Sequence, residues 1–536
     1  MTSRAWLVVF FLCVGCSGRP IFVDGGGTEL DAGPGGMVDA GPLADGGGSM
    51  EDAGARDAGM RPDAGPLPEM SEPSPPASIE REGSGGFLLR GTVLTPTGPL
   101  AGDVLIVGDT ITCVAADCSG EASADTVTVI ETFGVISPGL VDAHNHLTYD
   151  FLPEWEAGTT YGNRYEWTDV ADYETHILPF TDGRNENARI CPGAKWGELR
   201  SIVHGTTTVM GQSANRTCLD RLARNADHHH DLGYDHMRTT IGSPRELTDS
   251  DAMGLVEDFA DTSNPVTRYA VHMQEGVTGD NVLEEFDSFA GRDPRPNRHM
   301  GTSLLAAPDG SWSGVGLLIH SMSLTEAQLM EANAADASVV WSPSSNLVLY
   351  GETAPIARML ELDMTVAIGP DWTLSGEDHV LDEMRFAYAY GRAESIAALT
   401  PQRLWEMATA GGAHAVGLQA QIGALEPGMV ADVTVFGRRG MDPYAAVLDS
   451  EAEDVRLVLI GGQGYYGDLA LEMVSSINAE CDMLDACGSA KFLCTRNTPG
   501  GADRMDQTVE DVEDELLALL AMYGREADLE PLVRCD

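Results

Sequence analysis

Short apolar runs alternate with amphipathic stretches between residues 137 and about 425. The runs are rich in β-branched residues, as at 205–210 and 364–368, whereas the stretches between them carry apolar residues at helical spacing. Such alternation predicts parallel strands joined by crossover helices. Nearly 290 residues of this pattern match the length of a (β/α)8 barrel, so we expect an α/β fold with that barrel over residues 137–425.

Strand-like runs with Gly and Pro turns between them lie on both sides of this region. They cover residues 87–93, 103–107, 431–436 and 455–460. We expect residues 85–136 and 426–470 to form one small composite β-sandwich domain. Residues 471–536 then form a cysteine-containing C-terminal extension, with helical apolar spacing from residue 509 to 522.

The first 16 residues have the pattern of a signal peptide. Arg4 supplies a positive charge, and the apolar core at 5–14 is too short to span a bilayer. The end of this core, Cys13-Val14-Gly15-Cys16, resembles a bacterial lipobox, although Cys13 stands where leucine is usual. We expect an exported protein of the cell envelope, lipid-anchored through Cys16. An ordinary cleaved signal peptide, giving a periplasmic or extracellular protein, is the alternative.

Residues 17–84 are rich in Gly, Asp, Ala and Pro. The triplet Asp-Ala-Gly occurs five times, starting at Asp31. This composition offers too little apolar area to offset chain entropy, which predicts a disordered linker. A Ca²⁺-binding repeat is the alternative, and the irregular spacing of the triplets argues against it.

The chain is strongly acidic, with a formal net charge of −51 and only two lysines, Lys195 and Lys491. Such a charge argues against nucleic acid or an anionic membrane as a partner. We expect a small-molecule substrate and membrane attachment only through the lipid. The oligomeric state stays open, with a homodimer among the alternatives.

Eight cysteines remain outside the signal peptide, and an even number in an exported protein predicts disulfides. We expect the pairs Cys113–Cys118 and Cys191–Cys218, and two bridges within the last four cysteines. Those four are Cys481, Cys487, Cys494 and Cys535. Zinc binding by the four is the alternative, but their spacing lacks the Cys-x-x-Cys pattern.

His144 and His146 end the apolar run at 135–143. Alternate residues of a strand point to the same face, so both imidazoles can reach one point. Four further polar residues end apolar runs of their own: His272, Glu275, His320 and Asp371. Because barrels carry their catalytic residues at the carboxyl ends of strands, we predict a metal site with His144, His146, His272 and Asp371 as ligands.

These residue types suit hydrolysis by an activated water. A bound divalent ion lowers the pKa of water from 15.7 to about 7. We expect Asp371 to bind the metal and take a proton, and Glu275 to carry a proton to a leaving nitrogen. His320 would hold the water or stabilise an oxyanion. The other histidines are interpreted as structural, with His228, His229 and His230 in an exposed polar loop.

Several stretches resemble the amidohydrolase superfamily, and most closely its deaminase and chlorohydrolase branch. They are residues 136–146, 272–275, 342–346, 410–413 and 422–432, and the resemblance spans about residues 87–468. It implies hydrolysis of carbon–nitrogen bonds other than peptide bonds in a small, often heterocyclic molecule, with zinc or iron. By position it implies the same ligands, with Glu275 as proton shuttle and His320 as orienting histidine.

The scarcity of lysine favours one metal ion, because two-metal barrels of this superfamily commonly use a carboxylated lysine as a bridge. No lysine lies between Lys195 and Lys491. Zinc is the expected ion, with iron as the alternative. Trp372 replaces a usually small residue beside Asp371 and is expected to narrow the pocket. Between residues 208 and 272 one clear strand occurs, at 237–241, where two are expected.

The segment after His146 is rich in aromatic residues. They are Tyr149, Trp155, Tyr161, Tyr165 and Trp167. These rings would stack on a planar substrate or form a small core of their own. The expected activity is deamination, with hydrolysis of an amide or cyclic amide by the same residues as the alternative. A different class, a cell-surface binding protein on an inactive barrel, also stays open.

Overall fold

A computed structural model of the chain describes residues 74–180, 191–211, 222–228, 230–240, 242–475, 481–495 and 507–535. The predicted signal peptide and lipobox, and most of the predicted linker, lie outside these residues. No helix in the described ranges is long and apolar enough to cross a bilayer.

Eight short strands, β6 to β13, belong to two parallel sheets. The three-stranded sheet contains β6 (Leu140–Asp142), β7 (Thr206–Val209) and β8 (Arg224–Asn225). The five-stranded sheet contains β9 (Met237–Thr240), β10 (Arg268–Met273), β11 (Gly316–His320), β12 (Ser338–Trp341) and β13 (Val366–Ile368). Within each sheet the strands pair in parallel and in chain order.

Backbone hydrogen bonds join the two sheets where β6 meets β13. The Ala143 N–H donates to the Ile368 carbonyl at 3.3 Å, and the Asp371 N–H donates to the His144 carbonyl at 3.1 Å. The His146 N–H in turn donates to the Asp371 carbonyl at 2.7 Å. The first and last strands of the series therefore lie side by side, which gives a TIM-barrel-like α/β fold.

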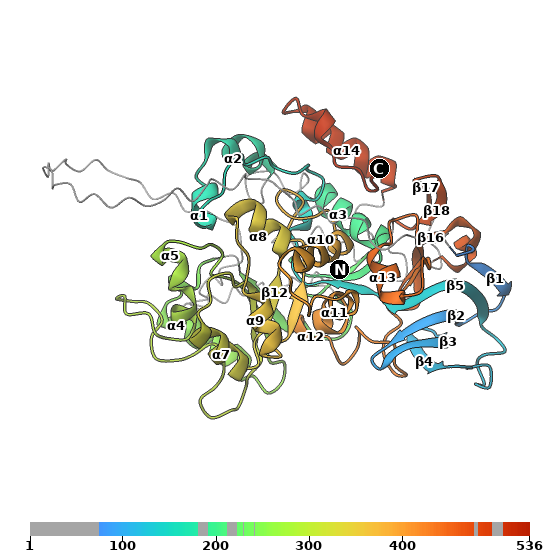
Figure 1. Cartoon of the computed structure of the whole chain (residues 1–536), viewed down its shortest axis with the longest axis horizontal. Helices are drawn as coiled ribbons and strands as arrows, with labels where there is room; N and C mark the ends of the chain where they lie inside the picture. The colour runs from blue at the N-terminus through green and yellow to red at the C-terminus, as the bar shows by residue number, and fades with distance from the viewer. Residues whose placement is uncertain are drawn as a thin grey trace, which may run out of the picture.

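Helices occupy most of the connections between these strands (Figure 1). They are α1 (Arg164–Trp167), α2 (Ala171–His176), α3 (Cys191–Val203), α4 (Asp249–Phe259), α5 (Asp280–Leu283), α6 (Glu285–Phe289), α7 (Glu326–Ala334), α8 (Pro343–Tyr350) and α9 (Ile356–Glu361). The helices after β13 are α10 (Val380–Ala393), α11 (Pro401–Met407), α12 (Ala410–Ala415), α13 (Pro443–Leu448) and α14 (Val509–Ala521). Local sequence sets their ends. Proline opens α8 at its first residue, and Gly351 ends the same helix in the left-handed conformation.

Strand β8 has two residues, and it is the second strand expected between residues 208 and 272, which the sequence pattern did not locate. The segment after it contradicts one expectation, because His228 and His230 are buried rather than exposed. His230 is held inside: its carbonyl accepts a hydrogen bond from Arg224 Nη1 at 2.7 Å, and its ring packs against His236. His229 lies outside the described residues.

The strands of both flanks share one ten-stranded sheet, seen beside the helical part of the molecule in Figure 1. Its order is β17-β18-β16-β15-β14-β5-β2-β3-β4, with β1 paired to β5. The bounds are β1 (Ser78–Arg81), β2 (Gly86–Thr95), β3 (Gly98–Val107), β4 (Thr110–Ala115), β5 (Thr128–Pro138), β14 (Val433–Phe436), β15 (Val455–Ile460), β16 (Gln463–Asp468), β17 (Asp482–Ala486) and β18 (Ser489–Leu493). The C-terminal extension thus continues the sheet of the flanking strands.

A buried ion pair links this sheet to the short strand β8. Arg224 Nε and Nη2 donate to the two carboxylate oxygens of Asp432, at 2.6 and 3.0 Å. Asp432 also accepts a hydrogen bond from the Gly461 N–H at 2.7 Å, beside β15. Both partners of the pair are buried. The ten-stranded sheet and β8 are therefore linked by a polar contact that is shielded from solvent.

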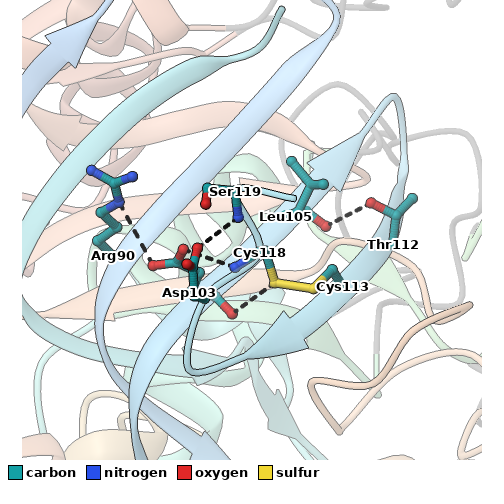
Figure 2. Close-up of a disulfide and its surroundings, with 8 residues drawn as sticks. Arg90, Asp103, Leu105, Thr112, Cys113, Cys118 and Ser119 are labelled. Atoms are coloured by element: carbon teal, nitrogen blue, oxygen red, sulfur yellow. Dashed lines mark hydrogen bonds and ion pairs between the residues drawn. A yellow bond between two sulfur atoms is a disulfide. The ribbon is translucent and has the colours of Figure 1, made fainter. Parts of the chain in front are cut away.

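Three disulfides confirm the predicted local pairing of cysteines. Cys113 and Cys118 are joined at the end of β4, where the Cys118 N–H also donates to Asp103 (Figure 2). The C-terminal four form two bridges, Cys481–Cys494 and Cys487–Cys535. Zinc binding by these four is therefore wrong. Cys191 is also disulfide-bonded, and its predicted partner, Cys218, lies outside the described residues.

Candidate metal centre

The four predicted ligands converge at the carboxyl ends of β6, β10 and β13. One ligating atom from each of His144, His146, His272 and Asp371 lies within 4.8 Å of the others. Asp371 Oδ1 is 3.0 Å from His144 Nε2 and 3.4 Å from His146 Nε2. Residues separated by more than 200 positions thus meet at one point, as a single metal ion requires.

The backbone is unusual where these strands end. Gln274, His320 and Asp371 have φ angles of 47°, 65° and 76°, which side-chain-bearing residues rarely adopt. Such conformations cost roughly 1–3 kcal/mol each and cluster at functional sites. At Gly369 a Cβ atom would lie 2.6 Å from the His144 backbone, so only glycine lets β13 approach His144 this closely. This approach brings Asp371 to the histidines.

Burial favours the neutral form of two of the ligand imidazoles. It lowers the pKa of His144 to about 4 and that of His272 well below its usual value. Burial alone would raise the pKa of Asp371, but hydrogen bonds from His144 and His146 hold it well below the usual range. Neutral imidazoles and an ionised carboxylate are the protonation states that bind a divalent cation at neutral pH.

Several of these buried nitrogen atoms have no hydrogen-bond partner among the described residues. They include the Nδ1 atoms of His144 and His272. Burying a polar atom without a hydrogen-bond partner costs folding free energy, so each such atom needs an explanation. A donor set of three imidazoles and one carboxylate fits a divalent ion that takes nitrogen and oxygen ligands.

Glu275 and His320 lie beside the ligands, in a second group. His272, Glu275 and His320 each place one ligating atom within 4.8 Å of the others. Burial raises the pKa of Glu275, and the charge of Arg164 opposes this rise. Burial lowers the pKa of His320 to about 4. A protonatable carboxyl and a neutral imidazole therefore face the space next to the ligands.

Two residues of the motif at 342–346 support this geometry, although neither was assigned a role from the sequence. Ser345 Oγ donates to Asp371 Oδ2 at 2.6 Å, leaving Oδ1 toward the histidines. Asn346 Nδ2 lies 3.0 Å from His320 Nδ1. Because an amide N–H donates, His320 Nδ1 accepts and the ring proton lies on Nε2, toward Glu275. The sequence signal that could have identified these two residues is the position of the motif directly after β12.

The aromatic segment after His146 packs mainly on itself. Trp155 and Trp167 are buried, and their ring centroids lie 6.4 Å apart. Trp372 is buried against this group, 5.6 Å from Trp167 and 5.8 Å from the ring of His146. The rings therefore form a small core that extends to the metal ligands. Stacking on a substrate stays a prediction for the half-buried Tyr149 and Tyr161.

Both lysines of the chain are engaged in contacts away from the predicted metal ligands. Lys195 Nζ donates to the Gln507 carbonyl at 3.3 Å, and Lys491 Nζ donates to Asp468 at 2.6 Å. These contacts are thus with groups other than the six predicted site residues.

Comparison with known proteins identifies a matching family and relatives that are consistent with the chemistry predicted for this site. The amidohydrolase family profile matches residues 296–463, which include His320 and Asp371. The 5-methylthioadenosine/S-adenosylhomocysteine deaminase of Halobacterium salinarum is 28% identical over 371 residues, 64% of this chain and 82% of that protein. The enzyme of the same name from Desulforamulus reducens is 26% identical over 422 residues, 70% of this chain and 92% of that protein.

The chain is similar to the amidohydrolase family over residues 296–463. Among solved structures, a mutant of atrazine chlorohydrolase from Arthrobacter aurescens, complexed with zinc and atraton, resembles this chain in fold. That structure has a TM-score of 0.52 and 19% identity, over 80% of this chain and 100% of its own. These similarities support the deaminase and chlorohydrolase branch of the superfamily, and the chain is a hydrolase of carbon–nitrogen bonds other than peptide bonds.

Proposed function

We propose that this amidohydrolase removes an amino group from a nitrogen heterocycle of the aminopurine type. The convergence of His144, His146, His272 and Asp371 within 4.8 Å, with Glu275 beside them, carries this proposal. The names of the relatives support it, because deaminases of adenine-containing compounds match over 82% and 92% of their own lengths. Hydrolytic deamination needs an activated water and a proton donor for the leaving nitrogen, and both can be assigned here.

We propose that the four ligands hold one divalent ion, with zinc as the ion. Three imidazoles and a carboxylate are common zinc ligands, and iron is the alternative. When bound, the ion would make water a stronger nucleophile at neutral pH. Ser345 keeps Oδ2 of Asp371 engaged, so Oδ1, which faces the histidines, is the oxygen that would bind the ion.

In the proposed reaction, the oxygen of water forms a bond to the ring carbon and the bond from that carbon to the amino nitrogen breaks. Asp371 takes a proton from the attacking water, and Glu275 delivers a proton to the leaving nitrogen. His320 directs its Nε2 proton toward the reacting oxygen, where it stabilises negative charge. The second proton of the water ends on the adjacent ring nitrogen, so the products are ammonia and a ring carbonyl beside an N–H group.

A screen of purified, zinc-loaded protein tests the substrate class. The panel would contain adenosine, 5′-methylthioadenosine, S-adenosylhomocysteine, guanine and several cyclic amides, with ammonia and ring opening measured separately. We expect ammonia release from at least one aminopurine. Ring opening of a cyclic amide without ammonia release would contradict deamination and support amide hydrolysis by the same residues.

We also infer that β6 to β13 close into a complete (β/α)8 barrel and that the ten-stranded sheet folds into a sandwich. The hydrogen bonds between β6 and β13 support closure on one side. A crystal structure tests the other side. Pairing between β8 and β9 is expected there, and a gap filled by side chains would contradict closure.

We propose that the protein is exported and attached to a membrane through lipid on Cys16. The Cys13-Val14-Gly15-Cys16 sequence supports the anchor, and the disulfides support an oxidising compartment. Expression of full-length chain and its Cys16→Ser variant in a bacterium tests this. Membrane-bound full-length chain and soluble exported Cys16→Ser are expected. Equal solubility of the two would contradict lipidation.

A further inference from the structure

The two carboxylate oxygens of Glu275 have different surroundings. Oε1 accepts a hydrogen bond from the Tyr350 hydroxyl at 2.6 Å. Oε2 lies 3.6 Å from Arg164 Nη1 and 3.7 Å from His320 Nε2, and both separations exceed an ordinary hydrogen bond. Oε1 is therefore engaged by a donor, whereas Oε2 faces a cation and an imidazole without a hydrogen bond to either.

Trp167 fixes the direction of the bond between Tyr350 and Glu275. The indole Nε1 of Trp167 donates to the Tyr350 hydroxyl oxygen at 2.8 Å. An indole N–H can only donate, so the tyrosine oxygen must accept there. The single hydroxyl proton of Tyr350 then points at Glu275 Oε1. All three side chains are buried, so water does not compete for these bonds.

The donor chain joins two helices that are distant in sequence. Trp167 is the last residue of α1, and Tyr350 is the last residue of α8; Figure 1 shows the two helices side by side. Helix α1 has a second attachment that does not involve Tyr350. Arg164 Nη2 is 2.8 Å from Glu285 Oε1, and Glu285 also accepts the Gln274 N–H at 2.7 Å. Removing the Tyr350 hydroxyl should therefore leave α1 in place.

We infer that Tyr350, oriented by Trp167, is a positioning residue for Glu275. By occupying Oε1, it leaves Oε2 as the oxygen that carries a proton to the leaving nitrogen. It also fixes the plane of the carboxyl group relative to His272 and His320. This inference rests on the proposed function, in which Glu275 moves that proton.

Three phenylalanine substitutions test the inference. Tyr350→Phe removes the hydroxyl that holds Oε1, and Trp167→Phe removes the donor that orients that hydroxyl. Tyr466→Phe is the matched control, because Tyr466 in β16 is equally buried and donates to the Ala452 carbonyl at 2.8 Å, in the ten-stranded sheet. For each variant, metal content, kcat, KM and a crystal structure of the zinc-loaded protein are compared with the unmodified chain.

Tyr350→Phe should lower kcat about 10- to 100-fold, with KM and zinc content unchanged, because a displaced catalytic group costs rate rather than binding. Its crystal structure should show the Glu275 carboxyl rotated from its position in the unmodified protein. Trp167→Phe should lower kcat less, since Tyr350 can still donate. Tyr466→Phe should match the unmodified enzyme in kcat, KM and the position of Glu275.

The inference is overturned if Tyr350→Phe matches Tyr466→Phe in kcat while Glu275→Gln is inactive. An unmoved Glu275 carboxyl in the Tyr350→Phe crystal structure overturns it too, and this readout needs no substrate. Failure of the proposed function gives a different result. In that case the unmodified enzyme releases no ammonia from any aminopurine, or Glu275→Gln itself retains full turnover, whatever Tyr350→Phe does.

Discussion

At the residue scale, the site combines neutral imidazoles with two carboxylates in opposite environments. Asp371 is held ionised by hydrogen bonds from His144 and His146, whereas burial raises the pKa of Glu275. One carboxylate is thus suited to bind a cation and the other to accept and release a proton. The two roles follow from neighbours only a few ångströms away.

Replacing Glu275 with glutamine should remove turnover without removing metal. The amide keeps the size of the side chain but cannot transfer the proton, so kcat should fall roughly 10²–10⁴-fold. Steady-state kinetics on an identified substrate and metal analysis of the same preparation measure both quantities. Glu284→Gln is the control, because Glu284 is exposed and pairs with Arg245. Turnover within twofold of the unmodified enzyme would remove Glu275 from the mechanism.

The six predicted site residues could be found from sequence because each ends an apolar run. Arg164 and Tyr350 could not be found this way. Arg164 lies in a polar and aromatic connection without strand-like periodicity, and Tyr350 is the last residue of a helix. Their proximity to Glu275 depends on how the connection after β6 lies across the barrel end, which no local pattern records.

At the element scale, the approach of β13 to β6 decides whether Asp371 reaches the histidines. Gly369 follows β13 directly and lies against the His144 backbone. The strands themselves were predictable from apolar runs bounded by turns. Strand β8 could not be predicted, because a strand of two residues is too short to show an alternation of apolar and polar positions.

Gly369→Ala should push the ends of β13 and β6 apart. The added Cβ would meet the His144 backbone at 2.6 Å, and overpacking of this kind costs about 1–3 kcal/mol. We expect lower zinc affinity and a lower free energy of unfolding, measured by competition with a chelator and by urea denaturation. In the control Gly316→Ala, on β11, the nearest atom would be 3.6 Å away. Equal behaviour of the two variants would show that this approach is not constrained.

At the scale of the whole molecule, the chain before and after the barrel-like region returns to one ten-stranded sheet. The sequence indicated that both flanks contribute strands. It could not show that β17 and β18 extend the same sheet, because edge pairing depends on which strand edges remain free after the rest has folded. The Arg224–Asp432 pair then joins this sheet to β8.

Arg224→Ala should destabilise the whole molecule strongly. Removing one partner leaves the Asp432 carboxylate buried and unpaired, which costs about 3–5 kcal/mol. Chemical denaturation of the disulfide-intact protein measures the change. Arg358→Ala is the control: Arg358 is an exposed partner of Glu326, and such pairs contribute about 0–1 kcal/mol. A loss for Arg224→Ala no larger than for Arg358→Ala would contradict the structural role of the buried pair.

Metal analysis of the purified protein and two histidine variants tests the central claim most directly. We expect one divalent ion per unmodified chain and less than about a tenth of that in His272→Ala after dialysis, because a ligand has been removed. His414→Ala, which alters a histidine outside the ligand group, should keep the full complement. Full metal content in His272→Ala, or no ion in the unmodified chain after incubation with zinc, would contradict the convergence of His144, His146, His272 and Asp371 on one cation.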